Sequence, residues 1–119
     1  MCDFSKITVG AREALNNSSH EDCANEILAL RQSIDNIDNA VIALLAERFK
    51  CTEKVGVIKA RNHISPEDKV REKSQIIRLK EVAKNAGLSE DIALQYHNFV
   101  VTEAKKRHKE IANSDNQEK

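Results

Sequence analysis

The sequence predicts an all-α protein in which three helices per chain, one of them very long, form an intertwined helical homodimer. Three observations predict this fold class. The 119 residues include only three Gly and one Pro, and aromatic side chains make up 3%, a composition that favours helices in a single domain. Apolar residues recur at alternating spacings of three and four over one long stretch. Capping residues mark two further helix starts.

The first predicted helix carries a continuous apolar seam. Its seam positions are Ile27, Leu30, Ile34, Ile37, Val41, Leu44, Cys51, Val55 and Ile58. This spacing is typical of one amphipathic helix. Capping boxes near residues 18–22 indicate its start, and we expect its end around Arg61 to His63. Gly56 interrupts the helix at a cost near 1 kcal/mol, which we interpret as a tight helix–helix crossing rather than a hinge.

A second helix is predicted from Pro66 to about Ala86. Ser65 would be its N-cap, with Pro66 in the first helical position, where the missing N–H costs least. Gly87 suits the left-handed backbone conformation that commonly ends a helix.

A third helix is predicted to begin after the capping residue Ser89 and to fade near Ala112. The expected organisation is a flexible leader at residues 1–18, a helical domain at 19–112 and a disordered tail at 113–119.

The first helix is too long for the rest of the chain to cover. About 40 residues make a rod of roughly 60 Å, whereas the other two helices would span about 30 and 35 Å. An apolar seam left in water needs another surface, and the simplest source is a second copy about a two-fold axis. We therefore predict an obligate homodimer.

The overall charge excludes some classes of partner. Lys+Arg and Asp+Glu both number 19, so the net charge is zero with His neutral. We therefore predict no nucleic-acid and no membrane partner. No stretch approaches the roughly 20 apolar residues of a membrane span, and none suits a signal peptide. The three cysteines, Cys2, Cys23 and Cys51, lack a C-x-x-C pair, so we expect neither a disulfide framework nor a zinc site, and a cytoplasmic protein.

A cation interrupts the apolar seam. Arg48 stands where the pattern requires an apolar residue, and Lys59, eleven positions on, returns to within roughly 20° of the same face. An unpaired Arg in a seam costs several kcal/mol, and no acid occupies a nearby seam position. We infer a pocket that receives an anion.

Metal and nucleophilic chemistry are weakly supported. The four histidines show no i, i+4 pairing and no H-E-x-x-H motif, so we predict no metal site. Cys51 lies on the seam and suits a core position better than a nucleophile. The sequence has no Gly-rich phosphate loop.

Charged residues of the second helix can join the two seam cations. Asp68, Arg71 and Glu72 share one face, and the turn between the helices brings that face back beside Lys59. Each charge also has an ordinary interpretation when taken alone. The acids suit first-turn dipole positions, Arg71 suits a surface charge, and Lys59 suits a solvated helix edge.

Arg31 can reach such a pocket only from another chain. It lies seventeen residues before Arg48, about 25 Å along the same helix. A pairing with Asp35 at i+4 is its ordinary alternative.

The motifs together resemble those of the all-helical chorismate mutases. In chain order they are L-R-Q-S-I-D-N-I-D, L-L-A-E-R-F, V-G-V-I-K-A-R and D-K-V-R-E. The resemblance covers about residues 26 to 112. It implies an intertwined homodimer with two active sites, and conversion of chorismate to prephenate, the first committed step towards phenylalanine and tyrosine. It implies no cofactor, because the reaction is an intramolecular rearrangement.

The resemblance implies roles for the matched cations. Arg31 would reach a substrate carboxylate from the partner chain, and Arg48 would hold a carboxylate from within the chain. Lys59 would bind a carboxylate and the ether oxygen, where negative charge grows as the C–O bond breaks.

The resemblance also implies roles on the second helix. Asp68 and Glu72 would orient the ring hydroxyl of the substrate, and Arg71 would support the cluster.

The third helix departs from the best-known members of the family. Ala104 and His108 stand where some members have Ser and Gln, and that Gln also donates to the ether oxygen. We hypothesise that His108 lies in the pocket, replaces this donor and makes activity sensitive to pH between about 5 and 8. Its alternative is a surface position in the basic run KKRHK.

Two other functions fit parts of the pattern. An isochorismate pyruvate-lyase of the same fold needs the same carboxylate-binding cations. A catalytically silent helical module would only dimerise or sense a ligand, and the intact charged set argues against it.

Overall fold

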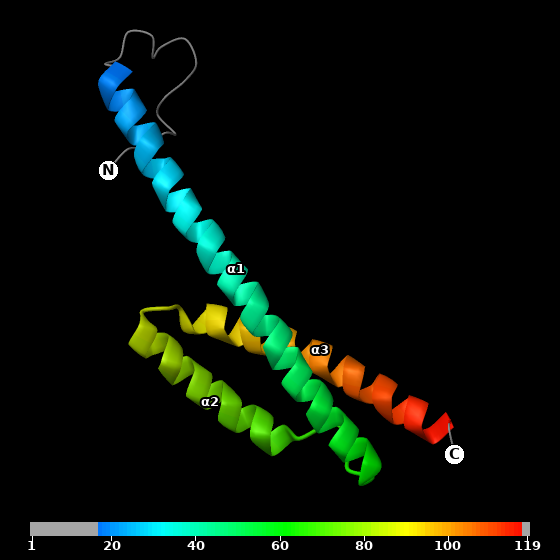
Figure 1. The fold of residues 1–119 in the computed structure, drawn as a ribbon. Coiled ribbons are helices and arrows are strands. Elements are labelled where there is room, and N and C mark those ends of the chain that lie inside the picture. The colour runs from blue at the N-terminus through cyan, green and yellow to red at the C-terminus, as the bar shows by residue number, and fades with distance from the viewer. Residues whose placement is uncertain (1–16, 118–119) are drawn as a thin grey trace. The chain divides into compact units, whose positions relative to one another are not determined.

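The computed structural model describes residues 17–117, and over that range helices joined by short connections are the only regular secondary structure (Figure 1). The helices are α1 (Asn17–Arg61), α2 (Lys69–Ala86) and α3 (Glu90–Gln117). The described residues contain no strand, so the all-α, three-helix prediction is confirmed. Most of the predicted leader, residues 1–16, lies outside the described residues.

The start of α2 corrects the sequence prediction. Its N-cap is Asp68, whose Oδ1 accepts a hydrogen bond from the backbone N–H of Arg71 at 3.0 Å. Ser65 instead closes a short turn, where its hydroxyl oxygen accepts the N–H of Glu67 at 3.2 Å. Ser65 and Asp68 both satisfy the local rules for an N-cap, and the structure uses Asp68, three residues further on.

The other helix ends are close to expectation. α2 ends at Ala86, and Gly87 has the predicted left-handed backbone, with φ 76° and ψ 21°. Before α3, the Ser89 hydroxyl oxygen accepts the N–H of Asp91 at 3.2 Å. α3 continues to Gln117, beyond its predicted end near Ala112, because extending an established helix costs little even through polar residues.

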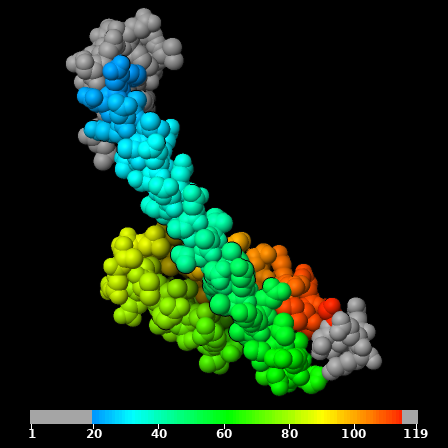
Figure 2. All heavy atoms as spheres, in the orientation of Figure 1, coloured from blue at the N-terminus to red at the C-terminus, as the bar shows by residue number. Residues whose placement is uncertain are grey.

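The chain divides into two compact units, residues 1–45 and 46–119. The described part of the first unit is a single helix, visible as a column of side chains in blue and cyan (Figure 2). Its large apolar seam residues are exposed, among them Leu30, Ile34, Ile37, Val41 and Leu44.

The second unit contains the rest of α1 together with α2 and α3. Its core is small and formed largely by short side chains, namely Ala83, Ala93, Val100 and Ala104. The rings of Phe49 and Phe99 meet edge to face, with centroids 6.5 Å apart at 86°. Small side chains let the helices approach closely, which brings the polar residues of all three helices together.

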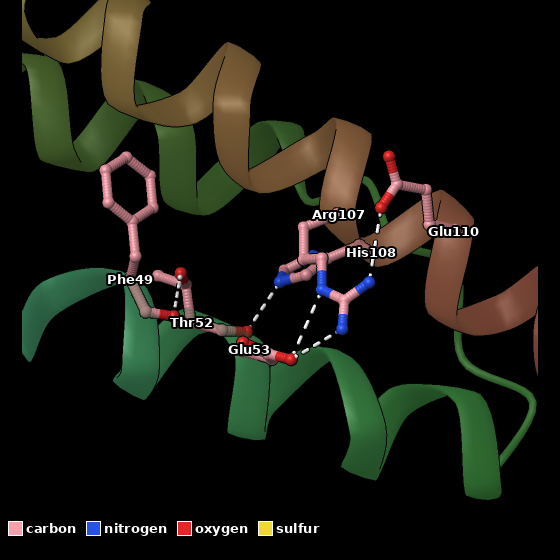
Figure 3. Close-up of polar contacts among 6 residues, drawn as sticks. All are labelled: Phe49, Thr52, Glu53, Arg107, His108 and Glu110. Atoms are coloured by element: carbon pink, nitrogen blue, oxygen red, sulfur yellow. Dashed lines mark hydrogen bonds and ion pairs between the residues drawn. The ribbon is translucent and has the colours of Figure 1, made fainter. Parts of the chain in front are cut away.

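Polar contacts join α1 to α3 beside this core (Figure 3). The Arg107 guanidinium bonds Glu53 at 2.8 Å and Glu110 at 3.2 Å. His108 Nε2 lies 2.6 Å from the Thr52 carbonyl oxygen. A Cβ added at Gly56 would lie 2.5 Å from His108 Cδ2, which confirms the predicted tight crossing.

The cysteines differ from expectation. Cys23 is disulfide-bonded, although the cysteine pattern predicts no disulfide framework. Cys51 is free but exposed, which differs from the expected core position. No described helix combines the length and the apolar character that crossing a membrane requires.

Candidate active site

A cavity of about 450 Å³ lies within the second unit and is lined by all three helices. The predicted site residues that line it are Arg48, Lys59, Asp68, Arg71, Glu72, Ala104 and His108. The structure therefore brings together the residues predicted on the second half of α1, the start of α2 and the middle of α3. Arg31 belongs to the first unit and is not part of this lining.

The two seam cations have few partners of their own. One guanidinium nitrogen of Arg48, Nη1, is buried and has no hydrogen-bond partner in the described part of the chain. The Lys59 ammonium donates to the neutral carbonyl oxygen of Pro66 at 3.4 Å. Burying a cationic donor without a partner is unfavourable, so the cavity favours an arriving anion.

Five cations face two carboxylates in the lining. The cations are Arg48, Lys59, Arg71, Arg78 and Lys105, and the carboxylates are those of Asp68 and Glu72. Side chains of Val55, Leu79, Tyr96 and Val101 add apolar surface. A positive, partly apolar cavity suits a small organic molecule that carries more than one negative charge.

Lys105 is a cavity residue absent from the predicted site. Its ammonium forms an ion pair with Glu72 Oε1 at 2.8 Å and lies 3.9 Å from Glu67 Oε1. A signal was available, because Val101, Ala104, Lys105 and His108 follow the i, i+3, i+4, i+7 spacing of one helix face. That spacing places Lys105 on the helix face that carries Ala104 and His108, but it does not reveal the ion pair with Glu72 of α2.

His108 is buried, with 8% of its surface exposed, so the alternative of a surface position is wrong. Because a carbonyl oxygen only accepts, the Nε2 atom that contacts Thr52 must carry a hydrogen. The other ring nitrogen, Nδ1, is buried without a partner among the described residues. The ring can therefore offer a ligand only Nδ1, as an acceptor when neutral and as a donor when protonated.

Comparison with known proteins identifies the family. The family model for chorismate mutase type II matches residues 30–112, more than half of the chain. The chain belongs to this family. The matched segment includes Arg31 and every residue that lines the cavity.

Two proteins named as chorismate mutases are similar to this chain. It is 29% identical over 76 residues to the chorismate mutase of Methanocaldococcus jannaschii, covering 64% of this chain and 77% of that protein. It is 30% identical over 80 residues to the bifunctional chorismate mutase/prephenate dehydratase of Buchnera aphidicola, covering 67% of this chain. The aligned region is 21% of the bifunctional protein, so this chain spans about a fifth of that relative.

Proposed function

We propose that the protein is a chorismate mutase, an isomerase that converts chorismate to prephenate for phenylalanine and tyrosine biosynthesis without a cofactor. The observation that carries the proposal is the buried, unpartnered Arg48 nitrogen in a cationic cavity. Membership of the chorismate mutase type II family supplies the substrate class.

The chemistry needs the cations but no nucleophile. Chorismate carries two carboxylates and must fold into a compact conformer before its ether bond can break. An Arg fork can fix one carboxylate in that geometry. As the C–O bond breaks, negative charge grows on the ether oxygen, and the Lys59 ammonium stabilises that charge more in the transition state than in the ground state.

The remaining lining completes the proposed site. Asp68 and Glu72 orient the ring hydroxyl, and Arg71 supports the cationic cluster. Ala104 leaves room beside the substrate, and His108 offers its Nδ1 to the ether oxygen as the protonated ring. The catalytic contributions thus come from Lys59, Arg48, Glu72 and His108.

A second copy of the chain would complete each site. The seam of the first unit is exposed in the isolated chain, and burying it against another copy would offset the cost of leaving it in water. Arg31 lies on the same stretch of α1 as this seam. We propose an intertwined homodimer in which Arg31 of the partner subunit contacts a substrate carboxylate.

The direct test is to follow chorismate loss and prephenate formation with the purified protein. We expect turnover by the wild type, severe loss in Lys59→Ala, and little change in Lys106→Ala, which alters an exposed lysine outside the cavity. Pyruvate release from isochorismate without prephenate formation would instead indicate the lyase. If neither substrate is turned over, the catalytically silent helical module is the remaining interpretation and the proposal is refuted.

A further inference from the structure

Lys105 connects α3 to α2 inside the cavity. Its ammonium contacts Glu72 Oε1 at 2.8 Å, across the interface between the two helices. It also lies 3.9 Å from Glu67, in the segment between α1 and α2. The residues carried over from the family do not include Lys105.

The surroundings of this ion pair are more shielded than those of the neighbouring pair. The Lys105 and Glu72 side chains are 29% and 26% exposed, whereas those of Lys106 and Glu103 are 65% and 43% exposed at 3.2 Å. Less exposed pairs are screened less by solvent and ions. The hydrogen bond to Glu72 raises the pKa of the Lys105 ammonium; partial desolvation opposes this, and the charges of Glu72 and Glu67 reinforce it.

Besides Lys105, four cations line the same cavity as the Glu72 carboxylate, namely Arg48, Lys59, Arg71 and Arg78. If the Glu72 carboxylate turned towards them, it would occupy the place of a substrate carboxylate. Lys105 approaches from α3 and engages Oε1, which leaves Oε2 to accept a hydroxyl hydrogen.

We propose that Lys105 is a positioning residue that holds the Glu72 carboxylate away from the anion-binding cations and oriented towards the ring hydroxyl of the substrate. This inference rests on the proposed function. Lys105 does not touch the reacting atoms in this arrangement, and it acts through Glu72. Contacts of this supporting kind commonly change activity by about 10- to 100-fold.

Three variants of the full-length protein test the inference. Lys105→Met keeps most of the length of the side chain but removes the ammonium group, and we expect kcat/KM for chorismate to fall by about tenfold or more. Lys105→Arg retains the cation and should recover most of that loss. Lys106→Met breaks the neighbouring exposed pair and should match the wild type. Equal activity of Lys105→Met and Lys106→Met would overturn the inference, and so would equal impairment of Lys105→Met and Lys105→Arg.

A double-mutant cycle separates positioning from a general structural role. In a Glu72→Gln background, Lys105→Met should cause little further loss, because the group through which Lys105 acts has lost its charge. Fully additive losses would overturn the inference. An active wild type whose Lys105→Met variant is unimpaired would refute this inference alone, whereas an inactive wild type would refute the proposed function and this inference together.

Discussion

At the scale of single residues, Arg48 shows that a residue of a binding site can lower the stability of the folded protein. A cation on an apolar seam with a buried, unpartnered nitrogen is unfavourable in the empty protein. A buried cation without a partner is expected where the charge binds a ligand and does not stabilise the fold.

Replacing Arg48 should therefore separate activity from stability. We expect Arg48→Met to lower kcat/KM for chorismate by about 100- to 1,000-fold, as for other preorganised charge-stabilising groups. The same variant should keep or raise Tm, because it removes an unsatisfied buried donor. The measurements are steady-state kinetics and thermal unfolding. Lys50→Met, which breaks the exposed pair with Glu47 at 2.9 Å, is the control, and a marked fall in the Tm of Arg48→Met would show a structural role instead.

His108 leads to a prediction about pH. Because Nε2–H is committed to the Thr52 carbonyl, only the protonated ring carries a hydrogen on Nδ1 that it can donate. We therefore expect kcat/KM of the wild type to depend on pH if His108 donates from Nδ1. The profile of His108→Gln should be flatter, because the amide keeps its hydrogens at every pH. Superimposable profiles for the two proteins would rule out proton-dependent donation by His108.

The Lys105 ammonium gives a second pH prediction. Glu72 raises its pKa above the ordinary value of 10.5, so the ion pair stabilises the fold below that value. This contribution is lost as pH rises through the higher folded-state value. NMR titration of labelled lysine side chains should show that Lys105 loses its proton at a higher pH in the wild type than in the Glu72→Gln variant. Identical titration curves would mean that the pair does not form in solution.

The predictability of the site differs from residue to residue. Arg48 could be predicted because it breaks a periodic pattern, and Glu72 because helical spacing places it with Asp68. Lys105 forms its contact across two helices, and sequence spacing within α3 carries no information on the residue that α2 places opposite. The start of α2 was misplaced for a related reason, since Ser65 and Asp68 both satisfy the local rules for a cap.

At the scale of elements, the crossing of α1 and α3 depends on the missing side chain of Gly56. The His108 ring occupies the space that a Cβ would need, at 2.5 Å from Cδ2 and 3.1 Å from Nε2. Thr52 and Glu53 anchor the same crossing through His108 and Arg107 (Figure 3). The glycine therefore sets the distance between two walls of the cavity.

Substituting this glycine should move the two helices apart. In an unconstrained helix, Gly→Ala would stabilise by about 1 kcal/mol. Here we expect Gly56→Ala to destabilise the protein by about 1–3 kcal/mol through overpacking, measured by urea unfolding. The double variant Gly56→Ala, His108→Ala should regain most of the lost stability, because the second change removes the ring that the added Cβ would contact. A Gly56→Ala protein more stable than the wild type would show that the ring moves aside at little cost.

At the scale of the whole molecule, the chain leaves much apolar surface uncovered. The exposed large side chains follow the predicted seam of α1 through both units, from Leu30 to Ile58. The length of this helix and its seam were predictable from the sequence because both depend on a period repeated many times. What covers the seam was inferred from that length alone, and the homodimer stays a prediction.

Mixing two inactive variants tests the homodimer and the role of Arg31 together. Arg31→Met and Arg48→Met should each be nearly inactive, because every site in either homodimer lacks one carboxylate-binding cation. In a heterodimer of the two, one site lacks both cations and the other has both. After the subunits are exchanged at equal concentrations, random pairing in a two-fold dimer should restore about a quarter of the wild-type activity. If native mass spectrometry shows heterodimers while the mixture stays as inactive as its parents, then Arg31 does not reach the site of its partner.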